Sequence, residues 1–107
     1  MRDSIGLIES FIDGMQLEDF RFDAKTQAAV ERKMQIISEA AIRLRDRADE
    51  LCPGLPWRDI RGMGNWLRHQ YDFVDLDTVW NTIQDDLPRL KMAILPVLAR
   101  MEAQTTT

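Results

Sequence analysis

The stretch that decides the fold is residues 24–51, "AKTQAAVERKMQIISEAAIRLRDRADEL". Its apolar side chains recur at alternating steps of four and three positions, at Val30, Met34, Ile37, Ala41, Leu44, Ala48 and Leu51. This spacing keeps one apolar stripe on one side of an α-helix, where it faces a partner helix. Asp23 is suited to cap the start of this helix, and Pro53 with Gly54 is expected to end it. The stretch therefore predicts one long helix within a helical bundle.

The rest of the chain follows the same helical periodicity, and no segment has the alternation of a strand. A first helix is expected from about residue 3 to residue 15, and a short amphipathic piece at 17–23. Pro56 suits the first turn of a further helix, and the last helix runs over residues 76–101. Pro88 and Pro96 fall inside that last helix, so we expect kinks or a break there. The prediction is an all-α, up-and-down bundle of four main helices plus a short one, which forms a single domain over residues 1–107 with a frayed tail at 105–107.

The composition limits the classes of function. The 107 residues carry 18 acidic and 14 basic side chains, a net charge of −4, so general attraction to nucleic acid is excluded and any polyanion must bind locally. The single cysteine, Cys52, excludes an internal disulfide framework and indicates a reduced environment. No apolar run approaches the roughly 20 residues that span a bilayer, and the N-terminus lacks the features of a signal peptide. We therefore expect a cytoplasmic protein that does not enter the membrane.

The segment "RGMGNWLRHQYD", residues 61–72, holds the only histidine of the chain. With a helical advance of roughly 100° per residue, one arc of this helix faces the core and carries Ile60, Met63, Leu67, Tyr71 and Val74. The neighbouring arc carries the polar side chains Arg61, Asn65, Arg68, His69 and Asp72. Gly62 and Gly64 each weaken a helix by about 1 kcal/mol relative to alanine, so they indicate close approach of a backbone, ligand or partner, or a bend.

Two interpretations of the polar arc remain open. Any surface helix has a polar arc opposite an apolar one, and a histidine beside arginines is commonly a solvated group. Alternatively, the arc serves phosphoryl chemistry, because His69 can take a proton from a 2′-hydroxyl of RNA and an arginine can stabilise charge on the phosphoryl oxygens. A metal site is disfavoured, because the arginines near the one histidine would repel a cation. Covalent catalysis is disfavoured too, because no serine or cysteine nucleophile lies near His69. We expect neither a metal nor a cofactor.

Two stretches of the sequence resemble a known family of proteins. "WRDIRGMGNWLRHQYDFVDLDTVW" followed by "DDLP" resembles the HepT toxins of the HEPN superfamily, and so does "TQAAVERKMQIISEAAIRL", with "SEAA" where many members read Gly-Glu-Ala-Ala. The resemblance covers roughly residues 26–90. It implies a helical homodimer that cleaves RNA without a metal, through an arginine–polar–histidine motif in a cleft between the two copies. It also implies a cognate minimal nucleotidyltransferase antitoxin of the MntA type, which in several members attaches AMP groups to the tyrosine of His-x-Tyr.

Carried over residue by residue, His69 matches the motif histidine, Asn65 the polar residue and Tyr71 the modified tyrosine. Gly64 stands in place of the motif arginine, which is a departure from the family pattern. Arg68 shares the arc and is our candidate for the missing cation, whereas seven residues separate Arg61 from the histidine, which is outside the motif's range. We expect Arg61, Arg58 and Trp66 to contact RNA, although Trp66 is equally suited to a dimer contact.

The sequence thus predicts a metal-independent endoribonuclease, the toxin of a toxin–antitoxin pair, with His69, Arg68 and Asn65 as its catalytic residues. The alternative is a non-catalytic helical dimer that binds a nucleotidyltransferase partner. Gly64 distinguishes the two hypotheses, because it stands in place of the arginine that the resemblance implies for catalysis.

Overall fold

A computed structural model describes residues 1–69 and 76–105 of the chain, and every regular element in these ranges is a helix. The four main helices are α1 (Arg2–Phe11), α3 (Ala24–Leu44), α5 (Trp57–His69) and the continuous run of α6 (Leu76–Asn81), the π-helical segment η2 (Thr82–Asp86) and α7 (Leu87–Thr105). Two short helices, α2 (Leu17–Arg21) and α4 (Arg47–Leu51), join them. The predicted all-α bundle is confirmed. Helix α7 includes Thr105, the first residue of the expected frayed tail, whereas residues 106–107 lie outside the described part.

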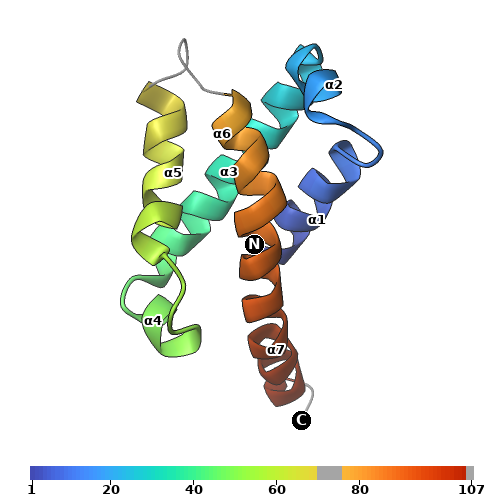
Figure 1. Ribbon diagram of the computed structural model, residues 1–107. Coiled ribbons are helices and arrows are strands. Elements are labelled where there is room, and N and C mark those ends of the chain that lie inside the picture. Colours follow the sequence, from blue (N-terminus) through green and yellow to red (C-terminus); the bar gives the residue numbers. More distant parts are fainter. Residues whose placement is uncertain (70–75, 106–107) are drawn as a thin grey trace.

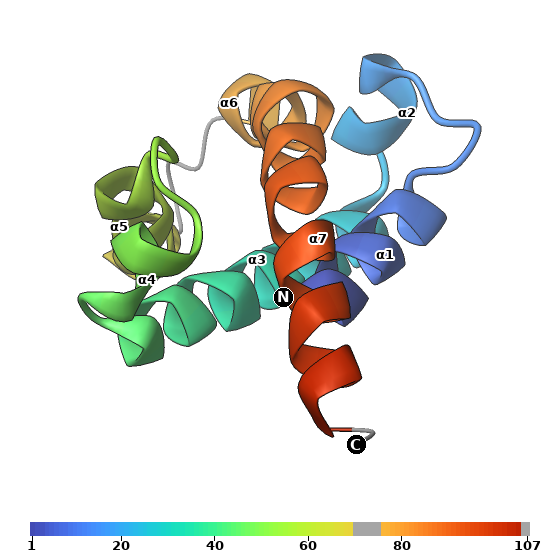
Figure 2. The ribbon, with the colours of Figure 1, turned by 90° about the horizontal axis from the view of Figure 1, so that it is seen from below.

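Helix α3 is the centre of the bundle. It packs most extensively against α5 and α1, and in Figures 1 and 2 these two helices lie on opposite sides of the run α6–α7. The side chains of the predicted stripe, Val30, Met34, Ile37 and Ala41, are fully buried. Helix α5 contacts α3 far more than it contacts α6–α7. The main support of α5 is therefore α3, which leaves space beside its other flank.

Helix α3 begins where the sequence predicts. The Asp23 carboxylate accepts hydrogen bonds from the Thr26 N–H at 3.0 Å and from the Thr26 hydroxyl at 2.7 Å. These bonds lower the pKa of Asp23, because they favour its charged form. A side-chain cap at this position satisfies backbone donors that the first turn leaves unpaired.

The single helix expected over residues 24–51 is wrong at Arg45, where the chain breaks into α3 and α4. Arg45 has a φ of 51°, a conformation that is uncommon for any residue except glycine. The break lets α4 turn back toward the core, where Ala48 is fully buried. The guanidinium of Arg61 stabilises the break, since it donates to the carbonyl of Arg45 at 2.6 Å. The apolar spacing predicts the contacts of this segment but not its change of direction.

We expected kinks or a break at the two prolines, but no break occurs, because the C-terminal run remains helical through both of them. The irregularity takes another form: η2 is a π-helical segment that ends two residues before Pro88. Proline has no N–H to donate and its ring crowds the carbonyl four residues earlier, which in this case belongs to Gln84 within η2. The wider π turn accommodates that crowding. No described helix is both long and apolar enough to cross a membrane.

Candidate functional site

Helix α5 carries the polar segment, and its two faces are clearly separated. Trp57 and Leu67 are buried, and the indole N–H of Trp57 donates to the carbonyl of Cys52 at 3.0 Å. On the opposite face Arg58, Gly62 and Asn65 are exposed. The core side of this helix is therefore fixed, and its polar side is open to a ligand.

A buried serine of α3 fixes the position of α5. The Ser38 hydroxyl donates to the carbonyl of Arg61 at 2.7 Å and accepts the N–H of Gly64 at 3.1 Å. Only 1% of Ser38 is exposed, so these bonds form where water does not compete. The two helices are thereby joined at residues 61 and 64 of α5, eight and five positions before His69. The sequence analysis did not predict this role of Ser38. A small polar residue next to the buried stripe could have indicated a hydrogen bond to the partner helix.

The two glycines have different explanations. Gly64 is buried against α3 and its backbone N–H bonds directly to Ser38, so the predicted close approach is confirmed for it, with α3 as the approaching element. A Cβ atom at Gly62 would meet nothing within 4 Å, so no close approach within the described chain accounts for that glycine. Gly64 and Ser38 are in direct contact through this hydrogen bond.

Arg61 turns toward α3 and away from the exposed face of α5. Its Nε donates to the carbonyl of Ala41 at 3.3 Å and its Nη2 to the carbonyl of Arg45. The Ala41 carbonyl lies in the last turn of α3, where a helix leaves its carbonyls without an internal partner. The Arg45 carbonyl follows the helix and also accepts the N–H of Ala48 at 3.3 Å. A cation at a helix C-terminus also interacts favourably with the helix dipole. The structure thus gives Arg61 the role of a cap for α3, which the sequence did not predict.

This geometry predicts a loss of stability when Arg61 is removed. Arg61→Ala should lower the free energy of unfolding by about 1–3 kcal/mol, the range for hydrogen bonds to a charged group. Arg58→Ala is the matched control, because Arg58 is an exposed arginine of the same helix, and its effect should stay within about 0.5 kcal/mol. Urea denaturation followed by circular dichroism measures both. Equal stabilities of the two variants would contradict the capping role.

The remaining predicted site residues differ in their exposure, and some of them lie outside the described part of the chain. Arg58 and Asn65 lie on the exposed face of α5, and Trp66 is half-buried against the core at the edge of a groove. The α5 backbone is helical through Arg68 and His69, one turn beyond Asn65, but their side chains are outside the described part. Tyr71 and Asp72 fall in residues 70–75, which are also outside it.

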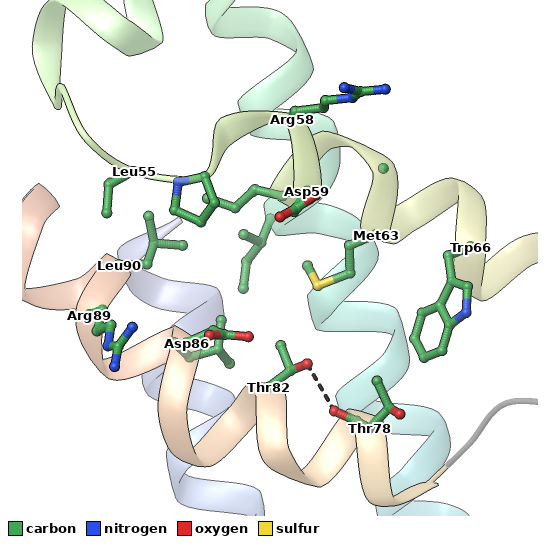
Figure 3. Close-up of a pocket in the computed structure, with 15 residues that line it drawn as sticks. Leu55, Arg58, Asp59, Met63, Trp66, Thr78, Thr82, Asp86, Arg89 and Leu90 are labelled. Atoms are coloured by element: carbon green, nitrogen blue, oxygen red, sulfur yellow. Dashed lines mark hydrogen bonds between the residues drawn. The ribbon is translucent and has the colours of Figure 1, made fainter.

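A groove of about 510 Å³ lies between α5 and the run α6–η2–α7 (Figure 3). Met63 and Trp66 line it from α5, Thr82 lines it from η2, and Ile37 of α3 contributes to its apolar lining. Carboxylates from both walls, Asp59 and Asp86, also line it. Sequence reasoning missed this groove, because its two walls come from segments whose relative position no local pattern specifies.

A second groove, of about 380 Å³, is mainly apolar and lies between the ends of α3 and α7. It is lined by Cys52, which is buried and whose Sγ lies 3.5 Å from the carbonyl of Ala93. Burial raises the pKa of the Cys52 thiol, so the thiol is neutral and is not an activated nucleophile. Among the described residues, no group of three His, Cys, Asp or Glu side chains is placed to hold a metal ion.

Comparison with known proteins bears on the exposed face of α5. The model of the "Ribonuclease HepT-like" family matches residues 1–97, which include this helix and the elements that support it. The chain belongs to the HepT-like family. The HepT-like chain is 40% identical over 89 residues to the "Probable ribonuclease HepT" of Thermococcus cleftensis, a match that covers 83% of the chain and 81% of the relative.

More distant relatives have similar names. A "Putative RNase" of Caldanaerobacter subterraneus subsp. tengcongensis is 32% identical over 83% of the HepT-like chain and 80% of its own length. A "Gamma-glutamylcyclotransferase and putative RNase" of Methanocaldococcus jannaschii is 32% identical over 94% of the chain, but the match covers only 45% of that larger protein. No solved structure matches the chain.

Proposed function

We propose that this HepT-like chain is a metal-independent endoribonuclease and the toxin of a toxin–antitoxin pair that acts in the cytoplasm. The observation that carries the proposal is the exposed face of α5. Arg58 and Asn65 lie on it, and the helix continues regularly to His69. Membership of a family described as ribonucleases supports the assignment to RNA cleavage.

The proposed reaction needs a base and a cation close to one phosphate. His69 takes the proton of a 2′-hydroxyl, whose oxygen then attacks the adjacent phosphorus and forms a 2′,3′-cyclic phosphate. The 5′-oxygen leaves with a proton, which the His69 of a second copy can supply across the dimer cleft. Arg68 stabilises the negative charge that develops on the phosphoryl oxygens, and Asn65 orients the imidazole or the phosphate. Arg58 and Trp66 hold the RNA, and neither a metal nor a cofactor takes part.

The hydrogen bonds between α3 and α5 made by Ser38 and Arg61 support this mechanism indirectly. Catalysis of this kind depends on groups held within a fraction of an ångström of their working positions. Ser38 joins α5 to α3 through two backbone groups, and Arg61 caps the end of α3. The helix that carries Asn65 and His69 is therefore anchored to α3 at residues 61 and 64, on the N-terminal side of the proposed catalytic residues.

The proposal includes a two-fold dimer that brings both copies of His69 toward one cleft. The chain has a mass of 12.5 kDa, so sedimentation at micromolar concentration should give twice that value, about 25 kDa. A monomer under these conditions would contradict the composite site, because the second proton donor would be absent.

We also propose a minimal nucleotidyltransferase of the MntA type as the antitoxin, with Tyr71 as the residue that it modifies. Co-expression with such an enzyme and ATP should add AMP mass to the chain. Tyr71→Phe should abolish the addition, because phenylalanine lacks the hydroxyl oxygen that attacks the nucleotide and releases pyrophosphate. Intact-protein mass spectrometry measures the change. Tyr71 is the only tyrosine of the chain, so unchanged labelling of Tyr71→Phe would place the modification on another residue type.

A second function is favoured by Gly64. Because glycine occupies the place of the motif arginine, the chain is also suited to act as a non-catalytic dimer that binds the nucleotidyltransferase. Incubation of the purified chain, free of antitoxin, with a mixed RNA in the presence of EDTA distinguishes the two functions. RNA cleavage supports the ribonuclease, and intact RNA together with a stable complex with the nucleotidyltransferase supports the binding protein.

A further inference from the structure

The groove beside α5 is lined by two exposed carboxylates, those of Asp59 and Asp86. Figure 3 shows Asp59 on the α5 wall of the cavity and Asp86 on the opposite wall, where the hydroxyl of Thr82 donates to the carbonyl of Thr78 at 2.9 Å. Within the described part of the chain, neither carboxylate has an ion pair or a hydrogen bond. Asp59 is in the first turn of α5, where an acidic residue suits the helix dipole, but Asp86 ends a π-helical segment and has no such role.

The other surfaces of the groove suit a flat, largely apolar ligand. Its lining is mainly hydrophobic, and the half-buried indole of Trp66 stands at one end. Its volume of about 510 Å³ is within the 300–1,000 Å³ range of small-molecule sites. An aromatic side chain beside an open groove gives a nucleobase a surface on which to stack. A base can therefore occupy this groove while its sugar and phosphate remain outside.

The carboxylates determine which base fits. An ionised carboxylate only accepts hydrogen bonds and can accept two parallel ones. Guanine offers two adjacent donors of this kind, N1–H and the N2 amino group. Uracil offers a single N–H between two carbonyl oxygens, which a carboxylate repels. We propose that this groove is a recognition subsite for a guanine base of the RNA substrate, an inference that rests on the proposed ribonuclease function.

The charges at the rim favour RNA over a basic peptide. Arg58 and Arg89 also line the groove, so its two arginines balance its two aspartates. Figure 3 shows the guanidinium of Arg58 directed away from the cavity. In the proposed complex the phosphate stays outside the groove, on the side of this cation. A basic peptide would meet these arginines on entry, whereas a nucleotide presents its base to the carboxylates and its phosphate to the arginines. Trp66 is also only three residues before His69, about 4.5 Å along the helix axis, so a stacked base places a neighbouring phosphate beside the catalytic position.

The test measures base preference separately from cleavage. Four dinucleotides that differ only in one base are titrated by calorimetry into His69→Ala protein, which keeps the groove and leaves the RNA intact. We expect the guanine ligand to bind at least tenfold more tightly than the uracil ligand. Asp86→Asn and Asp59→Asn should each remove most of this preference. Asp85→Asn is the matched control, because Asp85 is an exposed acid of the same π-helical segment that does not line the groove.

The outcomes separate this inference from the proposed function. Equal binding of all four ligands, in a chain whose wild type cleaves RNA, would overturn the guanine subsite and leave the ribonuclease standing. Guanine preference that depends on Asp86, in a chain that cleaves no RNA, would support the subsite and overturn the ribonuclease. Binding of a short arginine-rich peptide that no dinucleotide displaces would overturn the subsite and identify the groove as a protein-docking surface.

Discussion

His69→Ala is expected to lower the rate of RNA cleavage by about 10²–10⁴-fold, the usual cost of losing a general acid or base. The chain has no other histidine, so no neighbouring imidazole can replace it. The helical spacing places position 69 near Asn65, which is exposed, so the variant should keep its thermal stability. Single-turnover cleavage of a defined RNA, measured beside a melting curve, tests both expectations.

His69→Gln is the informative companion variant. Glutamine retains hydrogen-bonding groups but cannot take up a proton near neutral pH, so this variant should be as inactive as His69→Ala. An active glutamine variant would mean that residue 69 positions the RNA and that another group transfers the proton.

Arg68→Ala is expected to have the second large effect, a loss of about 10²-fold or more in the cleavage rate. This is the cost of removing one donor that stabilises charge in the transition state. Arg68 is the candidate because Gly64, at the position of the family's arginine, is buried against Ser38 and has no side chain. Initial rates at saturating RNA measure the chemical step without the contribution of binding.

Arg61→Ala is the control for Arg68→Ala, because the structure assigns Arg61 to the capping of α3. Its loss should act mainly on stability, and the catalytic rate of the remaining folded protein should fall much less. The assignment would be reversed if Arg68→Ala cleaved RNA at the wild-type rate while Arg61→Ala cleaved it slowly. The cation would then be Arg61, and its bonds to α3 would have to break when RNA binds.

The fold follows from the sequence where one physical rule acts alone. The four–three spacing of α3 correctly identifies its buried stripe, and Asp23 correctly marks its start, because both depend on neighbours within one helix. The break at Arg45 was not predicted, because the residue that stabilises it, Arg61, is 16 positions away in the sequence. The π-helical segment before Pro88 shows the same limit: proline predicts an irregularity but not its form.

In the candidate site, too, features that depend on one helix were predicted and features that depend on distant contacts were not. Helical spacing correctly placed Asn65 on the exposed face and Leu67 in the core. It assigned Arg61 to the polar arc, whereas the structure turns the side chain of Arg61 toward α3, because the carbonyls of Ala41 and Arg45 lie within its reach. The groove with Asp59 and Asp86 depends on how two distant helices pack, which no spacing within either helix contains.

The measurement that tests the central claim most directly is the chemistry of the RNA ends. Purified chain, freed of its partner, is incubated with a defined RNA in EDTA, and the products are identified by mass spectrometry. Attack by the 2′-hydroxyl with His69 as the base predicts 2′,3′-cyclic phosphate ends from the wild type and intact RNA from His69→Ala. Intact RNA from both proteins, or the same cleaved ends from both, would contradict the claim that α5 carries a metal-independent ribonuclease site.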